Sequence, residues 1–522
     1  LSLFSLRGST QCLAAVNKIK IKDFAIASPI VSPIAATTAS PDTESASRPI
    51  IYWFRQDLRL ADNPALSAAC ESGAVIPVYI FDQSNTQDWT LGGASRWWLH
   101  HALQSLDKSL GGKLNIFSGD ALAILSELSA SMSAKAVYWN RCYEPQSIDR
   151  DANIKTRLKE AGLDVQSFNG SLLWEPWQVL KKDGTPYKVF TPYYRRGCLQ
   201  KVAPRQPLPV PKTLDLVKAD NSLTVEDLSL LPAIDWDKKL HGDWDISEDG
   251  AKDRLDDFVF NGIQDYREGR NFPNKKNVSR LSPYFHFGQM SVNTAWYAAN
   301  DAAALIDNES NLDTFLSELG WREFSYYLLY HFPKLPTDNL QQRFNVFPWA
   351  KNTDAELKAW QKGKTGYPLV DAGMRELYGT GYMHNRVRMV VGSFMVKNLL
   401  IHWHSGERWF WDCLVDADLA ANSASWQWIA GCGADAAPFF RIFNPITQSE
   451  KFDKQGDYIR RHVPELAEMP AKYIHAPWLA PADVLAAAGV EIGTDYPAPI
   501  IDIKESRERA LAAFKMTKND VL

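Results

Sequence analysis

The chain has 522 residues, of which 45% are hydrophobic and 23% charged, and its formal net charge is −4. This ordinary globular composition argues against wholesale disorder and against a collagen-like or low-complexity protein. If nucleic acid is bound, a local basic patch must bind it, because the overall charge is negative. Six scattered cysteines without metal-ligand spacing predict no metal site and favour a reducing compartment, and no apolar run is long enough to span a membrane. The 19 tryptophans are an unusual count, for which a large aromatic core is the simplest explanation.

Residues 1–48 differ in composition from the rest of the chain. Ser, Thr, Ala and Lys dominate, and Asp23 is the only acidic residue before Asp42. The segment is similar to an organellar transit peptide followed by a disordered spacer, which would place the protein in a chloroplast or mitochondrion. A plain flexible extension, or upstream sequence included by a mistaken start, is the alternative, with a nuclear or cytoplasmic location. Both readings predict a soluble intracellular protein.

Residues 49–180 alternate between short β-branched or aromatic runs and helical stretches. The expected strands are 50–54, 74–81, 114–117, 136–139 and 165–168, and the expected helices are 61–72, 94–110, 120–130 and 146–161. Strands that alternate with helices predict an α/β domain with a doubly wound parallel sheet, which binds ligands at the carboxyl ends of its strands. Neither the G-x-G-x-x-G nor the G-x-x-x-x-G-K-[ST] sequence is present, so NAD or ATP binding by these routes has no support.

A proline-rich connector precedes a helical region. Residues 181–250 contain closely spaced prolines and then acidic residues, a composition typical of an inter-domain linker. After about residue 251, periodicity predicts helices at 252–266, 291–307, 312–331, 354–361, 368–378, 383–403, 407–414 and 458–468. We therefore expect an all-α domain over residues 251–510.

Three segments carry residue patterns suited to chemistry. One is the loop after the first expected strand, and the other two lie in the first part of the helical region. Residues 52–64 place two arginines and two aspartates after the first strand, and residues 269–281 contain four basic residues and no acid. Ser279 and Ser282 flank a helix start, where hydroxyls and free N–H groups suit a phosphate. Glu318 and Arg322 lie four residues apart on one helix with Trp321 beside them. The plain alternatives are a salt-bridged turn for residues 52–64, a solvated loop with an ordinary helix N-cap for residues 269–281, and a surface ion pair for Glu318 and Arg322.

Two further segments follow. No acid occurs from residue 377 to residue 406, whereas two arginines, a lysine and three histidines do. This stretch is typical of a face turned to an anion, or of a buried helix with snorkelling cations. Asp416 and Asp418 can point one carboxylate at an arginine and the other at a ligand N–H. Trp426 and Trp428 point their indoles in different directions, so one of them can face a cavity.

Together the five segments resemble the photolyase/cryptochrome flavoprotein family, in the family's order and spacing, from about residue 49 to about residue 470. The resemblance implies an N-terminal antenna domain, a long linker and a C-terminal domain that binds FAD. It implies FAD phosphate and ribose contacts from Tyr266, Val278, Ser279, Leu281 and Ser282, although most members have Thr where Val278 stands. Around the flavin and adenine it implies Glu318, Arg322, Asn385, Arg388, Asp416, Asp418 and Asn422. Asn385 is aligned with the residue that faces flavin N5, and Arg388 is expected to pair with Asp416.

The same resemblance implies a function in DNA. It favours light-driven repair of cyclobutane pyrimidine dimers, by electron transfer from excited reduced FAD to a flipped-out lesion in UV-damaged DNA. The alternative is a blue-light photoreceptor that signals through a partner without repair. The residues expected to act on the lesion are Glu318, Trp321, Asn385, Met389 and Trp428, and those expected to bind DNA are Arg270, Lys275, Lys276, Trp321, Arg386 and Trp428.

Three further expectations rest on the resemblance alone. Trp426, Trp403 and Trp349 are similar to a relay that carries electrons from the surface to the flavin. A folate antenna (methenyltetrahydrofolate) is favoured over a deazaflavin, with Glu144 in its pocket. A monomer is expected.

Overall fold

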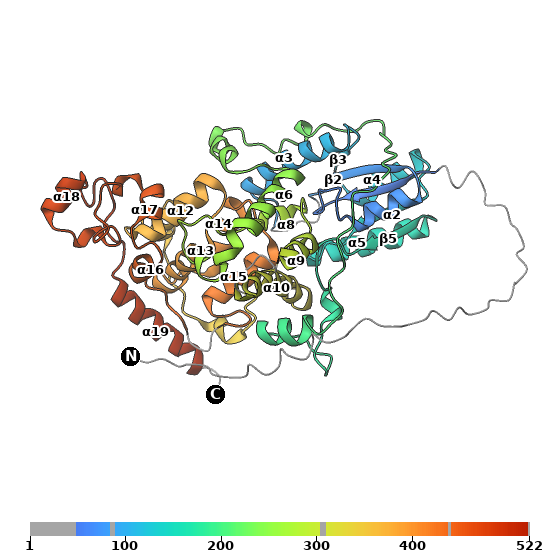
Figure 1. Ribbon diagram of the computed structural model, residues 1–522. Coiled ribbons are helices and arrows are strands. Elements are labelled where there is room, and N and C mark those ends of the chain that lie inside the picture. The colour runs from blue at the N-terminus through green and yellow to red at the C-terminus, as the bar shows by residue number, and fades with distance from the viewer. Residues whose placement is uncertain (1–47, 84–88, 303–308, 437–439, 520–522) are drawn as a thin grey trace, which may run out of the picture. The chain divides into compact units, whose positions relative to one another are not determined.

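The computed structural model describes residues 48–83, 89–302, 309–436 and 440–519 (Figure 1). The expected N-terminal extension over 1–48 lies, except for its last residue, outside the described residues. Within these ranges, no helix combines the length and the apolar character that a bilayer crossing would need.

The N-terminal domain is built on a five-stranded parallel sheet of order β3-β2-β1-β4-β5. Its strands are β1 (Ile50–Phe54), β2 (Val75–Phe81), β3 (Asn115–Ser118), β4 (Ala136–Asn140) and β5 (Asp164–Phe168). The helices between them are α2 (Pro64–Ser72), α3 (Gly93–Ser109), α4 (Ala121–Ser131) and α5 (Pro145–Glu160). The predicted doubly wound α/β domain is confirmed.

Alternate residues of the central strand feed two separate cores. Ile51 and Trp53 pack in one core with residues of α4 and α5, and Ile50 and Tyr52 pack in another with residues of α2 and α3. Successive side chains of a strand point to opposite faces, so a sheet covered on both faces needs strands that are apolar throughout. The second core continues into the helical domain through residues such as Tyr284, so the two domains share one apolar interior.

The expected linker packs along both domains. It contains the π-helical turn η2 (Pro192–Cys198) and the 3₁₀ turns η3 (Glu226–Leu228) and η4 (Asp235–Asp243). Leu216 and Leu223 form isolated bridges with the sheet residues Val75 and Ile116. The connector is therefore an ordered strap along the sheet.

The remaining helices form the C-terminal domain (Figure 1). They are α6 (Glu248–Asp257), α7 (Tyr266–Gly269), α8 (Ser282–Phe287), α9 (Val292–Asp301), α10 (Glu309–His331), α11 (Asp354–Gln361), α12 (Pro368–Thr380), α13 (Asn385–Ser393), α14 (Trp403–Cys413), α15 (Leu419–Ala430), α16 (Pro445–Phe452), α17 (Asp457–His462), α18 (Ala482–Ala488) and α19 (Ile503–Asn519). The predicted all-α character is confirmed, and α8, α15, α16, α18 and α19 lie outside the predicted ranges.

The single helix predicted over 383–403 is wrong. After α13 the chain makes a π-helical turn, η9 (Phe394–Asn398), and Leu400 adopts a left-handed backbone conformation with φ +56°. A residue with a β-carbon rarely takes this conformation inside a helix, so the helix is interrupted there. A new helix, α14, begins at Trp403 with His402 as its N-cap. The prediction of 458–468 is also too long, because α17 ends at His462 just before Pro464.

Candidate functional site

A cavity of about 540 Å³ opens in the helical domain, within the size range of cofactor sites. Helices α10, α13 and α15 and the segment before α8 supply most of its wall. Seventeen of the sequence-predicted site residues line it: Tyr266, Arg270, Val278, Ser279, Leu281, Ser282, Glu318, Trp321, Arg322, Asn385, Arg388, Met389, Asp416, Asp418, Asn422, Trp426 and Trp428. The structure therefore brings together side chains that come from four separate segments of the sequence, 266–282, 318–322, 385–389 and 416–428.

The first part of the cavity wall is an ion pair between the half-buried Arg388 and the buried Asp416. The Arg388 guanidinium donates to both carboxylate oxygens of Asp416, at 3.0 and 3.1 Å, as expected from the sequence. The Ser282 hydroxyl donates to the same carboxylate at 2.6 Å. Asp416 is buried, so Arg388 and Ser282 are what holds its charge inside the protein.

A second buried carboxylate, Asp418, lies beside the first. Its Oδ1 caps α15 by accepting from the Ala421 N–H at 2.7 Å, and its Oδ2 accepts from the Tyr326 hydroxyl. His286 Nδ1 lies 3.5 Å from the same oxygen. Burial works to raise the pKa of Asp418, but the hydrogen bonds from His286 and Tyr326 outweigh it, so the pKa is lowered. We call Asp416, Asp418, Arg388 and Asn422 the polar floor of the cavity.

Arg322 connects this cavity to the end of the N-terminal domain. Its guanidinium donates to the Ser171 carbonyl at 2.8 Å and to Glu323 at 3.1 Å, and it lies 4.8 Å from the centre of the Tyr326 ring. Glu323 in turn accepts from the Leu173 N–H at 2.8 Å. The cavity wall is thus fastened to the end of the N-terminal domain.

The aromatic mouth of the cavity consists of Trp321, Met389 and Trp428, which are all half-buried, with the exposed Asn385 beside them. The Trp321 ring stacks on Phe190 with centroids 3.8 Å apart and planes 10° apart. Phe190 comes from the strap and was missed in the sequence. The aromatic residues clustered over 187–194 were the only signal for it.

Glu318 lies at the same mouth and forms an ion pair with Arg270. The pair couples a residue expected to act on the lesion to one expected to bind DNA. Its two side chains are 31% and 21% exposed, so solvent and a ligand can both reach it.

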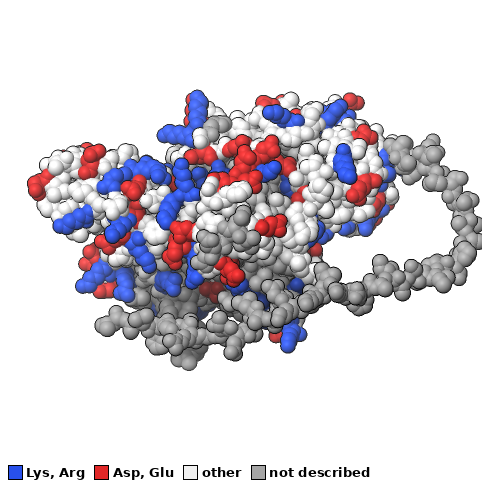
Figure 2. Space-filling model, in the orientation of Figure 1, with Lys and Arg blue, Asp and Glu red and all other residues white. Residues whose placement is uncertain are grey.

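Basic side chains surround the mouth unevenly. Arg386 donates to Asn271 and lies 4.6 Å from the Phe452 ring, and its pKa is lowered by burial and by the nearby charges of Arg270 and Arg441. Arg441 is exposed and was missed in the sequence. Lys275 is exposed but is paired with Asp265 at 2.7 Å, and Lys276 is exposed. On the face shown in Figure 2, acidic and basic side chains are interspersed, so any positive surface is local.

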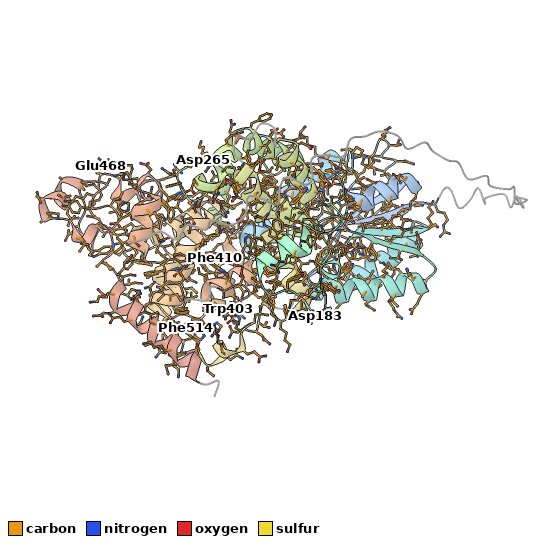
Figure 3. The ribbon with its side chains drawn as sticks, turned by 60° about the horizontal axis from the view of Figure 1, so that its bottom comes forward. Asp183, Asp265, Trp403, Phe410, Glu468 and Phe514 are labelled. Atoms are coloured by element: carbon orange, nitrogen blue, oxygen red, sulfur yellow. The ribbon has the colours of Figure 1, made fainter. Side chains whose placement is uncertain are left out.

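The three relay candidates run from the cavity outward. Trp426 lines the cavity and is buried against α14, where a β-carbon on Gly406 would lie 2.2 Å from its ring. Trp403 is fully buried in the helical domain (Figure 3), and its Nε1 donates to Asn339 at 3.0 Å. Trp349 is half-buried. Trp426 thus packs against α14, the helix that begins at Trp403.

Glu144 lies away from the cavity, at the carboxyl end of β4. Its Oε1 accepts from Gln56 at 2.8 Å, and its buried Oε2 has no hydrogen-bond partner within the described part of the chain. Tyr143 and Trp177 lie nearby with ring centroids 6.2 Å apart. This is the edge at which a doubly wound sheet binds ligands.

Comparison with known proteins agrees with this arrangement. Residues 50–212 match the family model for DNA photolyase, and residues 315–516 match the model for the FAD binding domain of DNA photolyase. The chain is 49% identical to a deoxyribodipyrimidine photo-lyase from Agrobacterium fabrum, over 90% of this chain and 98% of the relative. It is 39% identical to cryptochrome-2 of Arabidopsis thaliana, over 90% of this chain and 79% of the relative.

Solved structures give the same result. The crystal structure of a bacterial class III photolyase from Agrobacterium tumefaciens matches with a TM-score of 0.87 at 48% identity, and covers 93% of this chain and 100% of that chain. A cryptochrome structure from Synechocystis sp. matches with a TM-score of 0.81 at 30% identity, over 90% and 99% of the two chains. The chain belongs to the photolyase/cryptochrome flavoprotein family.

Proposed function

We propose that this chain repairs cyclobutane pyrimidine dimers in UV-damaged DNA with light, as a deoxyribodipyrimidine photo-lyase that uses FAD. One observation carries the proposal: a carboxylate, two indoles and an amide (Glu318, Trp321, Trp428 and Asn385) line the mouth of the same cavity whose floor holds Asp416 and Asp418. The 49% identity to a photo-lyase over nearly the whole relative supports it.

The cavity fits FAD in size and in chemistry. Its volume of about 540 Å³ suits a cofactor, and its apolar walls are interrupted by a few fixed polar groups. The cofactor, when bound in its reduced form and excited by light, supplies an electron to the lesion and takes it back. Phosphate and ribose contacts are assigned to Tyr266, Val278, Ser279, Leu281 and Ser282.

The polar floor would hold the polar edge of the flavin. Asp416 is already fixed by Arg388 and Ser282, so it does not have to reorganise when a ligand arrives. Asn422 donates its amide N–H to the Glu407 carbonyl at 3.0 Å, which leaves the amide oxygen available to the cavity. Asn422 therefore competes with Asn385 for the place opposite flavin N5. Comparing Asn422→Asp with Asn385→Asp identifies the right one, because an acid beside N5 changes the flavin absorption spectrum.

The mouth would receive the lesion. A dimer inside a duplex is unreachable, so it must be flipped out, which costs a few kcal/mol and less at a damaged base. Trp321 and Trp428 would stack on the extruded bases, and such stacking is worth about 1–3 kcal/mol per base. Trp321 is already held by its stack on Phe190, so it offers a prepared surface.

Glu318 and Arg270 would act together on the reacting bases. In its protonated form Glu318 would donate a hydrogen bond to a pyrimidine carbonyl, and the adjacent Arg270 guanidinium would oppose the negative charge that develops on the lesion. Arg386, Lys275, Lys276 and Arg441 would contact phosphates that hold the strand in place.

Two accessory roles complete the proposal. Trp426, Trp403 and Trp349 would carry electrons from the surface to keep the cofactor reduced. Glu144 would contact an antenna chromophore, because its buried Oε2 has no partner within the described residues. The family resemblance favours a folate over a deazaflavin as this chromophore.

The test is a light-dependent repair assay on the full chain with reduced FAD. Duplexes that contain a cyclobutane dimer, a six-four photoproduct or no damage are illuminated with blue light, with matched dark samples. Repair of the cyclobutane dimer in light alone supports the proposal. Light-driven chemistry at the flavin with no repair of either lesion would instead favour the photoreceptor alternative.

A further inference from the structure

His402 lies against two of the three relay indoles, and none of the roles above uses it. The centre of its ring is 4.9 Å from the Trp349 ring and 5.7 Å from the Trp403 ring. It meets Trp349 edge-on, with planes 62° apart, and lies nearly parallel to Trp403, with planes 25° apart. Any charge on this imidazole therefore acts on both outer indoles.

The backbone holds His402 in its neutral form. Its Nδ1 accepts a hydrogen bond from the His404 N–H at 3.2 Å and so caps α14. An acceptor Nδ1 carries no proton, so the neutral ring has its proton on Nε2, and protonation at Nδ1 would break the cap. Burial lowers the pKa of His402 below its ordinary value.

Few other charges surround this ring. The His404 ring lies 4.5 Å from it, and burial, His402 and Arg408 together lower the pKa of His404 to about 4, against a smaller opposing effect of Asp338. For His402 itself burial is the cause of the lowered pKa. The two rings oppose each other's protonation, so His402 is neutral at neutral pH and takes up a proton only in acid.

Electron transfer along the relay moves a positive hole outward. Trp426 is oxidised by one electron first, and this electron goes to light-excited oxidised flavin in the cavity. Trp403 then reduces it and becomes oxidised, and Trp349 does the same for Trp403, with no bond formed or broken and no proton moved. An external thiol finally reduces Trp349. A proton on His402 would place a positive charge about 5 Å from both outer indoles and, at an effective dielectric constant of about 20, would disfavour an outer hole by roughly two orders of magnitude.

We propose that His402 is a proton-controlled gate on the outer half of the relay. The neutral ring lets the hole reach Trp403 and Trp349, and the protonated ring holds it at Trp426, from which it returns to the cavity. His402 is a positioning residue in this role, because it acts through the two indoles. The gate rests on the relay assigned under the proposed function.

The test measures the long-lived tryptophan radical by transient absorption in the full chain with oxidised FAD and an external thiol, between about pH 4.5 and about pH 8. The yield should fall several-fold toward acid in the natural protein. His402→Asn keeps an acceptor for the cap but cannot become charged, so its yield should stay high at every pH. His402→Asp also caps α14. Its negative charge should favour a positive hole on Trp403 or Trp349 at least as well as the neutral ring does. The control is His462→Asn, which replaces a half-buried histidine of α17 whose pKa is lowered to about 4, and it should keep the natural pH profile.

A second readout does not depend on the cofactor. The His402 ring, assigned by difference from His402→Asn, is titrated by NMR, and its midpoint should coincide with the fall in radical yield. A pH-independent yield in the natural protein, or an unchanged acid fall in both His402 variants, overturns the gate. If Trp403→Phe leaves the yield unchanged, the relay is wrong and the gate with it. Repair by chemically reduced protein tests the proposed function separately, because it does not need the relay.

Discussion

The floor and the mouth of the cavity differ in the kinds of side chain that form them and in how exposed these side chains are. In the polar floor, Asp416, Asp418 and Asn422 are buried and already have partners, such as the half-buried Arg388 that pairs with Asp416. The aromatic mouth consists of half-buried rings and an exposed amide, with the solvent-accessible pair of Glu318 and Arg270 beside them.

The difference indicates two kinds of ligand. Fixed, buried charges suit a group that binds once and stays, because they are costly to rearrange. Half-exposed rings suit a substrate that enters and leaves, since stacking needs no fixed hydrogen-bond pattern. A mutation in the floor should therefore change cofactor binding, and a mutation in the mouth should change only the handling of DNA.

The largest effect is expected in the floor, from Asp416→Asn. It leaves the Arg388 guanidinium without its charged partner, and breaking a buried pair costs about 3 kcal/mol or more, so FAD should bind more than about a hundredfold more weakly. Absorbance of the purified protein measures the bound FAD. Asp412→Asn is the matched control, because this carboxylate bonds the Gly93 N–H outside the cavity. Full FAD content in Asp416→Asn would remove the distinction between floor and mouth.

The next effect is expected in the mouth, from Trp428→Ala. Loss of one stacking surface should weaken binding of dimer-containing DNA by about 2 kcal/mol, roughly thirtyfold, with FAD content unchanged. Trp177→Ala is the control, because this indole is 43% exposed and belongs to the N-terminal half of the chain. Equal losses in the two variants would mean that Trp428 does not face the lesion.

A smaller effect is expected from Glu318→Ala. Repair per absorbed photon should fall several-fold while FAD and DNA stay bound, and Glu318→Gln should lose less, because an amide still hydrogen-bonds a pyrimidine carbonyl. The control is Asp313→Ala, which lies on the same helix as Glu318 and removes an exposed ion pair with Arg195. A repair yield unchanged in Glu318→Ala would take this carboxyl out of the chemistry.

The smallest effect is expected in the pH dependence of the free energy of unfolding, from Glu407, whose backbone carbonyl bonds the floor residue Asn422. Burial raises the pKa of Glu407 to about 8, although the Ser423 hydroxyl donates to it at 2.6 Å. The folded state therefore keeps a proton that the unfolded chain releases, so the free energy of unfolding should fall as pH rises toward about 8. Glu407→Gln should flatten this slope, which is on the order of 1 kcal/mol per pH unit between about pH 5 and about pH 8, measured by denaturant unfolding. A slope that survives in Glu407→Gln would place its origin in another group.

The sheet was predictable because its signals are local. Each strand is a short apolar run bounded by turns, and its observed limits lie within about two residues of those predicted, for example Ile50–Phe54. The interruption of the helix at Leu400 was not predictable, because side-chain periodicity does not report the sign of φ.

The sequence predicted residues that line the cavity, but it did not predict the residues that hold them in place. The residues that line the cavity come from motifs that are contiguous in the sequence. Phe190 behind Trp321, and Tyr326 and His286 on Asp418, come from other segments and meet these residues only through the fold. The contact of His402 with Trp349 likewise depends on the turn that starts α14.

The most direct test of the account is the fluorescence of the bound reduced flavin. If the flavin lies on the floor and the lesion at the mouth, adding dimer-containing DNA should quench the emission by electron transfer. Undamaged DNA should not quench it, and a Trp321→Ala/Trp428→Ala double variant should show much weaker quenching at saturating DNA. Saturated binding of dimer-containing DNA with the emission unchanged would contradict the account.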